Sequence, residues 1–512
     1  MDDTLMPWAA AGRMPKIAII GSGLSGLAAV VHLRKAGYDD VTVYEKAAAV
    51  GGTWRDNRYP GLSCDIASYW YSFTFAPNPR WSHRYPLGEE IRAYLEKVTD
   101  DFDIRRCIRF ETPVERLVSI GQRWRLVTRH GEDTYDIVIS ATGILHHPKL
   151  PEIPGLRDFR GRVFHSSRWE DDAPVDGARV GVIGTGSTAA QIVGALGARC
   201  ARLSCFQRTP QWMFPLLQKR YSGWWKWLMA RVPGLPRLMY HAHRLALERT
   251  LGPATMGNTL MQRLFEWTCR WNLQRTVKDS DLRRKLTPDY RAGCKRLVIC
   301  STFYEAIVRD NVELVTDAIE RLEPEGVRTR DGRLHALDTL VLCTGFHSNR
   351  FILPVDVIGS EGQRLADVWG EAPRAHRAMS VPGFPNLWFL EGPGGPVGNI
   401  SLVSVSEIQI RYIVQVLDAM RRRGLAAVSP RRLSFERYNA DLAQAVRRTI
   451  WATGGCRSWY IDASGDPNLY AHPPARFYRD MRRPDLAEYE LTPAQASTER
   501  SHFRDQALER VE

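Results

Sequence analysis

Two glycine-rich turns, each placed between a buried apolar run and a helical pattern, constrain the fold of this chain most. The first is GSGLSG, residues 21–26, and the second is GTGSTA, residues 184–189. Each follows a run of strand length and precedes a helix with an apolar stripe. A turn of this kind places a helix N-terminus against a dinucleotide pyrophosphate. The sequence therefore predicts an α/β fold with two Rossmann-like dinucleotide-binding domains.

The first unit is complete over residues 16–45. Gly21 allows the tight turn, Gly23 lets the backbone approach the pyrophosphate, and Gly26 lets the helix pack closely on the strand. Glu45 ends the next strand, at the position that hydrogen-bonds ribose hydroxyls. We therefore expect a nucleotide with free ribose hydroxyls at this site.

The second unit differs at the end of its second strand. Gly184, Gly186 and Ala189 form a G-x-G-x-x-A turn, within which Ser187 is expected to bind the cofactor. Arg208 and Thr209 stand where the first unit has its acid. A carboxylate would repel a 2′-phosphate, whereas an arginine can clamp one. Two such units in one chain suggest electron transfer. We expect FAD in the first site and NADPH in the second.

Composition excludes other classes of protein. The 512 residues contain no apolar run of eighteen or more, and the N-terminus has two acids before any base. We expect no transmembrane segment, no secretory signal and a cytoplasmic location. The net charge of +13 is dispersed rather than clustered, which argues against nucleic acid. The nine cysteines lack a C-x-x-C pair, so we expect neither a disulfide framework nor a metal site.

The segment that joins the two units carries a further pattern. FRGRVFHSSRW fits F-x-G-x-x-x-H-x-x-x-W through Phe159, Gly161, His165 and Trp169. It resembles the fingerprint of type I Baeyer–Villiger monooxygenases, although Glu170 follows where the family usually has Pro or Asp. GGTWRDNRYPGLSCD (51–65), TPDYRAGCKRLVICSTFYEAI (287–307) and GCRSWYIDASGDPNLY (455–470) resemble other segments of the same family. The resemblance spans roughly residues 15–475.

This resemblance implies an FAD- and NADPH-dependent monooxygenase that uses O₂, through a C4a-peroxyflavin, to convert a ketone into an ester or lactone. It implies that Arg296 is the catalytic cation and that Asp65 orients it. It places Lys295 with Arg208 and Thr209 on the 2′-phosphate. The expected FAD contacts also include Gly52, Thr53, Trp54 and Asp65.

The resemblance also makes Phe159, Gly161, His165 and Trp169 a hinge that couples NADPH binding to oxygenation. Without it, a bend at Gly161 with His165 and Trp169 packed at a domain interface explains the same residues. Trp459 is expected to line the substrate or NADP⁺ pocket, or to pack in the core.

The order of the motifs predicts how the domains divide. We expect an FAD-binding domain from residues 14–147 and 376–485, an NADPH-binding domain from 148–214 and 291–375, a helical insertion at 215–290, and a polar tail at 486–512. Residues before 14 are expected to form a loose extension. The insertion is rich in Trp and Arg, which suits either a cap on the NADPH domain or a membrane surface.

An alternative function remains open, namely a flavin monooxygenase that oxygenates N or S centres of small substrates. The resemblance implies a small-molecule ketone as the substrate, but the sequence predicts neither which ketone nor the oligomeric state.

Overall fold

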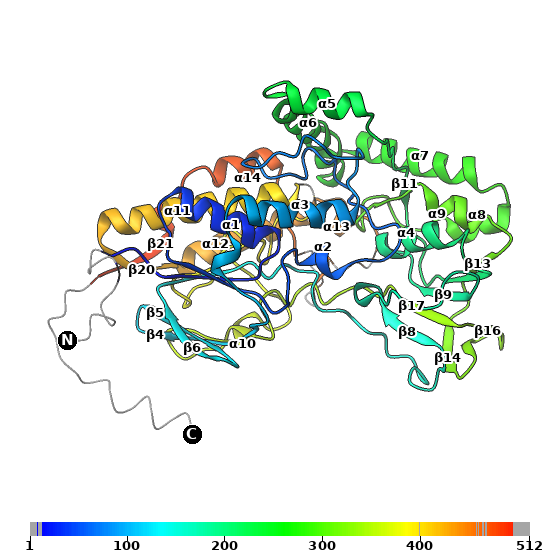
Figure 1. The fold of residues 1–512 in the computed structure, drawn as a ribbon, viewed down its shortest axis with the longest axis horizontal. Helices are drawn as coiled ribbons and strands as arrows, with labels where there is room; N and C mark the ends of the chain where they lie inside the picture. Colours follow the sequence, from blue (N-terminus) through cyan, green and yellow to red (C-terminus); the bar gives the residue numbers. More distant parts are fainter. Residues whose placement is uncertain are drawn as a thin grey trace.

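Two parallel sheets form the two halves of the molecule (Figure 1). The computed structural model describes Trp8 and residues 13–398, 400–456, 458, 460–462, 465 and 468–494. The first sheet has five strands in the order β19 (Leu387–Phe389), β7 (Ile137–Ser140), β1 (Ile17–Ile20), β2 (Val41–Tyr44) and β3 (Ile108–Arg109). The second has the order β13 (Val312–Val315), β10 (Arg202–Phe206), β9 (Arg179–Ile183), β17 (Thr339–Leu342) and β8 (Arg162–His165). The α/β fold with two Rossmann-like units is confirmed.

The central strands are apolar because helices cover both faces of a parallel sheet. All four residues of β1, IAII, are buried, as are those of β7. Ile17 pairs with Val41 on one side and Ile137 on the other. The first turn leads into α1 (Leu24–Lys35), which shares a core cluster with α11 (Leu402–Arg423). The second turn leads into α4 (Ser187–Leu196), which packs with α9 (Thr302–Ile307) in a separate core cluster.

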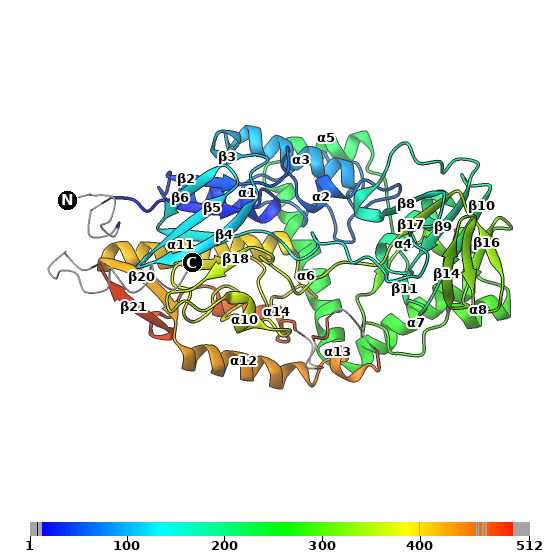
Figure 2. The same ribbon diagram turned by 90° about the horizontal axis from the view of Figure 1, so that it is seen from below.

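Smaller elements complete the two halves. The first half adds α2 (Thr53–Asp56), α3 (Gly88–Asp101), the sheet β18 (Asp356–Ile358), β4 (Val114–Ile120), β5 (Arg123–Thr128) and β6 (Gly131–Tyr135), and helices α10 (Leu365–Trp369), α12 (Arg432–Val446), α13 (Ile450–Thr453) and α14 (Pro474–Asp480). The second half adds the antiparallel sheet β14 (Ile319–Glu323), β15 (Gly326–Thr329) and β16 (Leu334–Ala336). Figure 2 shows α12 along one outer side of the first half.

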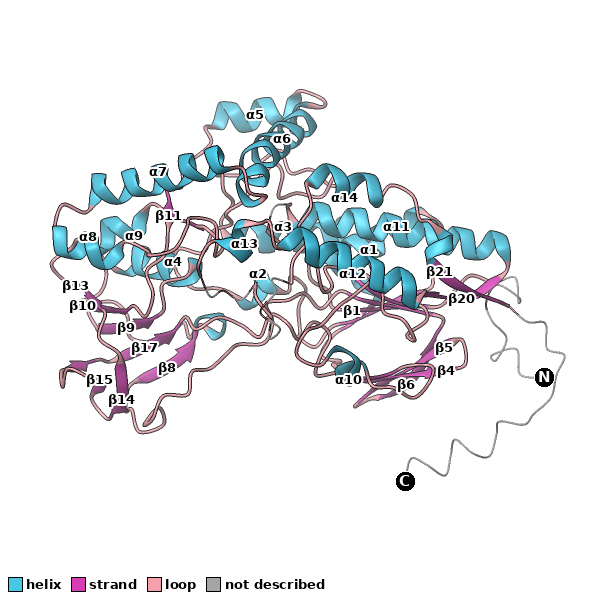
Figure 3. Ribbon diagram, turned by 180° about the vertical axis from the view of Figure 1, so that it is seen from behind, coloured by secondary structure: helices cyan, strands magenta, loops and turns pink. Residues whose placement is uncertain are grey.

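Four helices occupy the stretch predicted to be a helical insertion: α5 (Gly223–Arg231), α6 (Leu235–Thr255), α7 (Thr259–Thr276) and α8 (Ser280–Leu286). The short strands β11 (Met213–Phe214) and β12 (Val298–Ile299) pair in parallel where the chain leaves and returns. Figure 3 shows α5 and the start of α6 standing apart from both sheets. No helix among the described residues is long and apolar enough to span a membrane.

Two extended segments cross between the halves side by side. Pro148 and Phe346 form an antiparallel bridge. The Lys149 N–H donates to the Gly345 carbonyl at 2.9 Å, and the His347 N–H donates to the His147 carbonyl at 2.9 Å. The halves are therefore joined by a short two-stranded ladder at the point where each parallel sheet ends.

The structure corrects two expectations. Cys294 and Cys456, 162 residues apart, form a disulfide, and the other seven cysteines are free. Tertiary packing brings the pair together, because the Arg291 N–H bonds the Gly454 carbonyl, and sequence spacing does not reveal this.

The N-terminal extension is also not wholly loose. Trp8 is buried, and Arg13 forms an ion pair with Asp136 at 2.6 Å. At the other end, β21 (Tyr489–Pro493) pairs with β20 (Leu425–Pro430), while residues 495–512 lie outside the described part of the chain.

Candidate active site

A cavity of about 2070 Å³ lies between the two halves and reaches both glycine turns. Most predicted site residues line it: Gly21, Gly23, Glu45, Gly52, Thr53, Trp54, Asp65, Gly186, Ser187, Arg208, Lys295 and Arg296. Gly26, Gly184 and Thr209 support the turns from outside the cavity, and none of the four predicted hinge residues lines it. The fold thus gathers into one space residues that lie up to 275 positions apart in the sequence, from Gly21 to Arg296.

The first glycine turn can be built only without side chains. Gly21 has φ +105°, and a Cβ there would lie 2.6 Å from the Ala141 carbonyl oxygen. Gly52 has φ +52°, and a Cβ there would lie 3.1 Å from the Gly23 Cα. The turns that contain Gly23 and Gly52 therefore contact each other through their backbones at the N-terminus of α1. This leaves backbone N–H groups accessible to a pyrophosphate.

Glu45 holds the first turn as well as lining the cavity. Its buried carboxylate accepts hydrogen bonds from the Ser22 backbone N–H at 2.9 Å and the Ser22 hydroxyl at 2.8 Å. The Arg55 guanidinium donates to its other oxygen at 3.0 Å. The predicted ribose contact stays a prediction, and the structure adds that this acid fixes the loop that carries Gly21 and Gly23.

The second turn repeats the geometry with one difference. Gly184 has φ +123°, and a Cβ there would lie 2.5 Å from the Cys343 carbonyl oxygen. A Cβ at Gly186 would meet no atom within 4 Å, so this residue faces open space at the N-terminus of α4. A ligand can therefore approach the backbone of Gly186 directly.

Two cations lie together at the end of β10. Arg208 and Lys295 both line the cavity. Burial and the neighbouring charge of Arg208 lower the pKa of Lys295. Neither side chain has an ion pair with a carboxylate in the described part of the chain. Thr209 contributes to the turn through its carbonyl, which accepts from the Thr185 hydroxyl at 2.8 Å. The two side chains, neither of them in an ion pair with a described residue, form a positively charged site suited to a phosphate.

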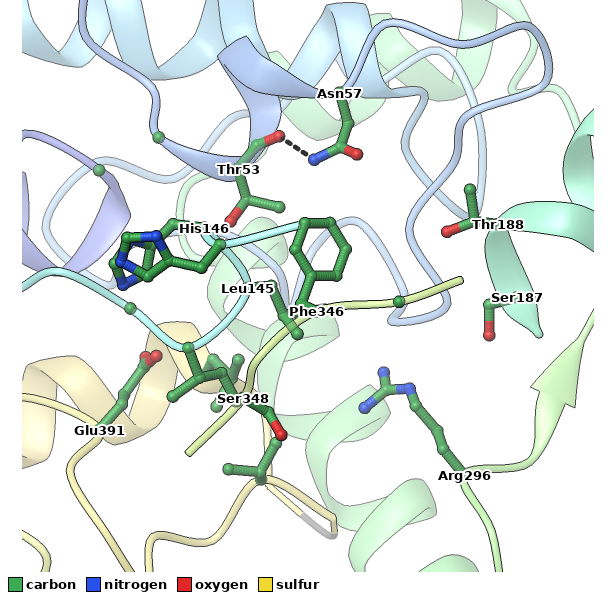
Figure 4. A pocket seen from close by; sticks show the side chains of 18 of the residues that line it. Thr53, Asn57, Leu145, His146, Ser187, Thr188, Arg296, Phe346, Ser348 and Glu391 are labelled. Atoms are coloured by element: carbon green, nitrogen blue, oxygen red, sulfur yellow. Dashed lines mark hydrogen bonds between the residues drawn. The ribbon is translucent and has the colours of Figure 1, made fainter. Parts of the chain in front are cut away.

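Arg296 and Asp65 form an ion pair across the two halves. The Arg296 Nη2 and Nε donate to one oxygen of Asp65, at 2.6 and 3.2 Å. The Asp65 charge raises the pKa of Arg296, so the guanidinium stays protonated. Figure 4 shows the guanidinium pointing into the cavity. The contact predicted from the sequence is present, and the catalytic role of the pair stays a prediction.

The four predicted hinge residues divide into two groups. Phe159 and Trp169 are buried in separate core clusters, and a Cβ at Gly161 would lie 2.5 Å from the Phe159 ring. His165 instead contacts the crossing ladder. The Ser167 N–H donates to its Nδ1 at 3.2 Å, so Nε2 carries the hydrogen and donates to the Gly345 carbonyl at 3.0 Å. Burial lowers the pKa of His165, which keeps the ring neutral.

Sequence reasoning missed Glu391, a buried acid that lines the cavity next to α1. Its carboxyl accepts from the Ser406 hydroxyl at 2.7 Å and the Ser25 hydroxyl at 3.4 Å. Burial raises its pKa to about 7. The sequence feature that could have identified it is an acid inside WFLEGPGG, two residues after the buried strand β19 ends. Figure 4 shows Glu391 and Arg296 entering the cavity from different elements.

Further contacts join the segments that meet between the halves, and Tyr59 and Gly61 belong to the segment GGTWRDNRYPGLSCD. Tyr59 donates to Gln191 of α4 at 3.2 Å, and a Cβ at Gly61 would lie 2.8 Å from the Gln191 carbonyl. His146 and His147 contact the carbonyls of Phe351 and Leu353, both at 2.9 Å. These contacts tie the segments between the halves to their surroundings. Trp459, by contrast, lies outside the described residues.

Comparisons with known proteins give one consistent result. Residues 14–424 match the family described as Flavin-binding monooxygenase-like. The chain is 40% identical over 491 residues to a Baeyer-Villiger monooxygenase of Streptomyces coelicolor, and the match covers 94% of this chain and 93% of that protein. It is 36% identical to a Baeyer-Villiger monooxygenase of Pseudomonas aeruginosa, over 98% of this chain and 96% of that protein.

Solved structures agree with these relatives. The fold is similar to that of OTEMO in complex with FAD and NADP, with a TM-score of 0.85, 26% identity, and 94% and 100% of the two chains covered. It is also similar to cyclohexanone monooxygenase from Rhodococcus sp. Phi1 bound to NADP⁺, with a TM-score of 0.83, 26% identity, and 94% and 99% covered.

Proposed function

Because this chain belongs to the flavin-binding monooxygenase-like family, and its relatives include Baeyer-Villiger monooxygenases, we infer that it is an FAD- and NADPH-dependent enzyme that uses O₂ to convert a ketone into an ester or lactone. The resemblance identified from the sequence is confirmed. One observation carries the assignment: a charged Arg296 enters a single large cavity that also reaches two bare glycine turns.

The residues present fit both cofactors. The contact between Gly23 and Gly52 leaves a groove without side chains for the FAD pyrophosphate. Open space at Gly186 and the cations Arg208 and Lys295 suit the pyrophosphate and 2′-phosphate of NADPH. When bound, the flavin accepts a hydride from NADPH and activates O₂, which is redox chemistry that no side chain supplies.

Arg296 supplies the electrostatic part of the reaction. Its guanidinium stays charged and presents several donors to negative charge that develops on the reacting oxygens. Asp65 acts as a positioning residue because it holds one edge of the guanidinium. Since Asp65 and Arg296 belong to different halves, this geometry exists only when the halves are correctly docked.

The walls of the cavity suggest an apolar ketone. Helices α6 and α7 contribute apolar side chains to the lining: Leu247, Leu251, Met261, Leu264 and Phe265. An aliphatic or aromatic ketone would remove this surface from water, which is favourable, whereas a charged group placed against these five side chains would lose its hydration without gaining a partner. We propose a hydrophobic ketone as the substrate class.

Product analysis tests the function. The purified enzyme with NADPH and air is offered cyclic, aromatic and long-chain ketones and, separately, a thioether. We expect an ester or lactone that is heavier than the ketone by one oxygen. Formation of sulfoxide alone, with every ketone returned unchanged, would overturn the proposal in favour of N- or S-oxygenation.

We also propose a cytoplasmic location. Seven of the nine cysteines are free, which fits a reducing compartment, and the Cys294–Cys456 disulfide is the exception.

A further inference from the structure

One surface of the insertion exposes large apolar side chains that no part of the described chain covers. Trp224 and Trp227 on α5 are 66% and 57% exposed. Leu238 on α6 is 62% exposed, and Val232 in the turn between the two helices is 41% exposed. We call these four residues the insertion tip. Figures 1 and 3 show this end of α5 and α6 at the outer edge of the molecule.

The inner face of α5 packs against the rest of the protein, so the residues on its outer face are not needed for the core. Met229 is buried, and the Trp225 indole N–H donates to the Tyr69 hydroxyl at 3.0 Å. Trp224 and Trp227, three residues apart, lie on the opposite, exposed face. The helix is thus fixed to the protein on one side and presents two indoles on the other.

The same region is strongly basic. Residues 177–247 contain no Asp or Glu. Within 215–247 the Lys and Arg residues are Lys219, Arg220, Lys226, Arg231, Arg237 and Arg244. The first five form no ion pair with a described residue, and Lys219, Arg220, Arg231 and Arg237 are exposed. The charge around the insertion tip is therefore left for an external partner.

The chemistry of the insertion tip favours one partner. A second copy of this chain would bring the same positive charges against each other. A nucleic acid would gain from the indoles and the charges but not from Val232 and Leu238. An anionic lipid surface satisfies all of them, because indoles and leucines enter the acyl boundary while Lys and Arg remain among the headgroups.

We propose that the insertion tip docks on an anionic lipid surface as a peripheral membrane contact. This lipid contact is a property separate from the oxygenation of the ketone. Helix α6 starts at the insertion tip, and its later residues Leu247 and Leu251 line the cavity. Leu264 of α7 lines the same cavity and is 50% exposed, so the cavity opens on this side of the molecule. A docked enzyme would meet hydrophobic substrate where such molecules concentrate.

Vesicle binding tests the proposal without any turnover. The holoenzyme is sedimented with vesicles of phosphatidylcholine alone and of phosphatidylcholine mixed with phosphatidylglycerol. We expect binding to the mixed vesicles, little to the neutral ones, and a decline as salt rises. Trp224→Ser with Trp227→Ser should reduce vesicle affinity about tenfold or more. Arg231→Glu with Arg237→Glu should reduce it by a similar factor.

Matched controls separate a local contact from general surface charge. Leu433 on α12 is 56% exposed, and Arg432 and Arg437 are exposed on the same helix, which lies across the molecule from α5 in Figure 2. Leu433→Ser, and Arg432→Glu with Arg437→Glu, should leave vesicle binding unchanged. Retained FAD and an unchanged melting temperature would show that each variant is folded.

Four outcomes would overturn the proposal. One is failure of the wild type to bind mixed vesicles. Another is an equal loss of binding in the α12 controls. In the third, the wild type does not bind vesicles and the Trp224→Ser, Trp227→Ser double variant changes its oligomeric state. This result would assign the insertion tip to a second copy of the chain. Tight binding to an oligonucleotide but not to lipid would likewise assign it to nucleic acid.

Discussion

At the scale of single residues, Glu391 makes stability depend on pH. Burial raises its pKa from 4.5 to about 7. Between these values the folded protein keeps a proton that the unfolded chain releases, so the free energy of unfolding falls as pH rises through this window. Glu391→Gln removes the effect. It should raise the free energy of unfolding by up to ~3 kcal/mol at about pH 8 and change it little near pH 4.5. Urea unfolding at both pH values measures this, and equal shifts at both would contradict it.

Arg208 and Lys295 should determine which nicotinamide cofactor is used. If they hold the 2′-phosphate, Arg208→Ala should raise the KM for NADPH about tenfold to a hundredfold, the loss expected for one charge-assisted hydrogen bond. The KM for NADH should barely change, because NADH lacks that phosphate. Steady-state kinetics with both cofactors measures the difference. Arg309→Ala, at an exposed arginine outside the cavity, is the control. An equal rise of the KM for NADPH and for NADH would show that Arg208 does not bind the 2′-phosphate.

At the scale of elements, the second glycine turn contains a matched pair of glycines. Gly186 has an ordinary φ of −70° and faces open space, so Gly186→Ala should fold normally. Its methyl group would stand where the pyrophosphate approaches, and the KM for NADPH should rise about tenfold, equivalent to ~1.4 kcal/mol.

Gly184 has φ +123° and a close backbone neighbour, so Gly184→Ala should instead lower stability, by about 1–3 kcal/mol. Melting temperature and KM, measured on both variants, separate the two effects. If the two variants changed the melting temperature and the KM for NADPH by similar amounts, the pyrophosphate would not approach the backbone of Gly186.

Local patterns predicted these elements well because their physics is local. A strand, a bare turn and a helix are encoded within about 30 consecutive residues, so the sequence alone locates both glycine turns. The contact between Asp65 and Arg296 was reached only through resemblance, since 231 positions separate them. The role of Glu391 and the Cys294–Cys456 disulfide could not be predicted from the sequence, because their environments are formed by segments that meet only in the folded chain.

At the scale of the whole molecule, His165 connects the NADPH half to the crossing ladder. His165→Ala removes the donor to the Gly345 carbonyl, and a lost buried hydrogen bond costs about 1–3 kcal/mol. We expect both cofactors to bind almost normally while more of the NADPH consumed appears as hydrogen peroxide. His165→Gln should restore part of the coupling, because its amide can donate to the same carbonyl. A lower melting temperature with unchanged coupling would show that His165 is purely structural.

We propose that the two halves together place one arginine, Arg296, where oxygen transfer occurs. The most direct test is the amount of ester formed per NADPH consumed by wild type, Asp65→Ala and Arg296→Ala. Arg296→Ala should keep FAD and still oxidise NADPH, yet ester formation should fall about a hundredfold to a thousandfold, with hydrogen peroxide in its place. Asp65→Ala should show a smaller loss, since it only positions the arginine. An Arg296→Ala enzyme that makes ester at the wild-type rate would show that Arg296 does not stabilise the reacting oxygens.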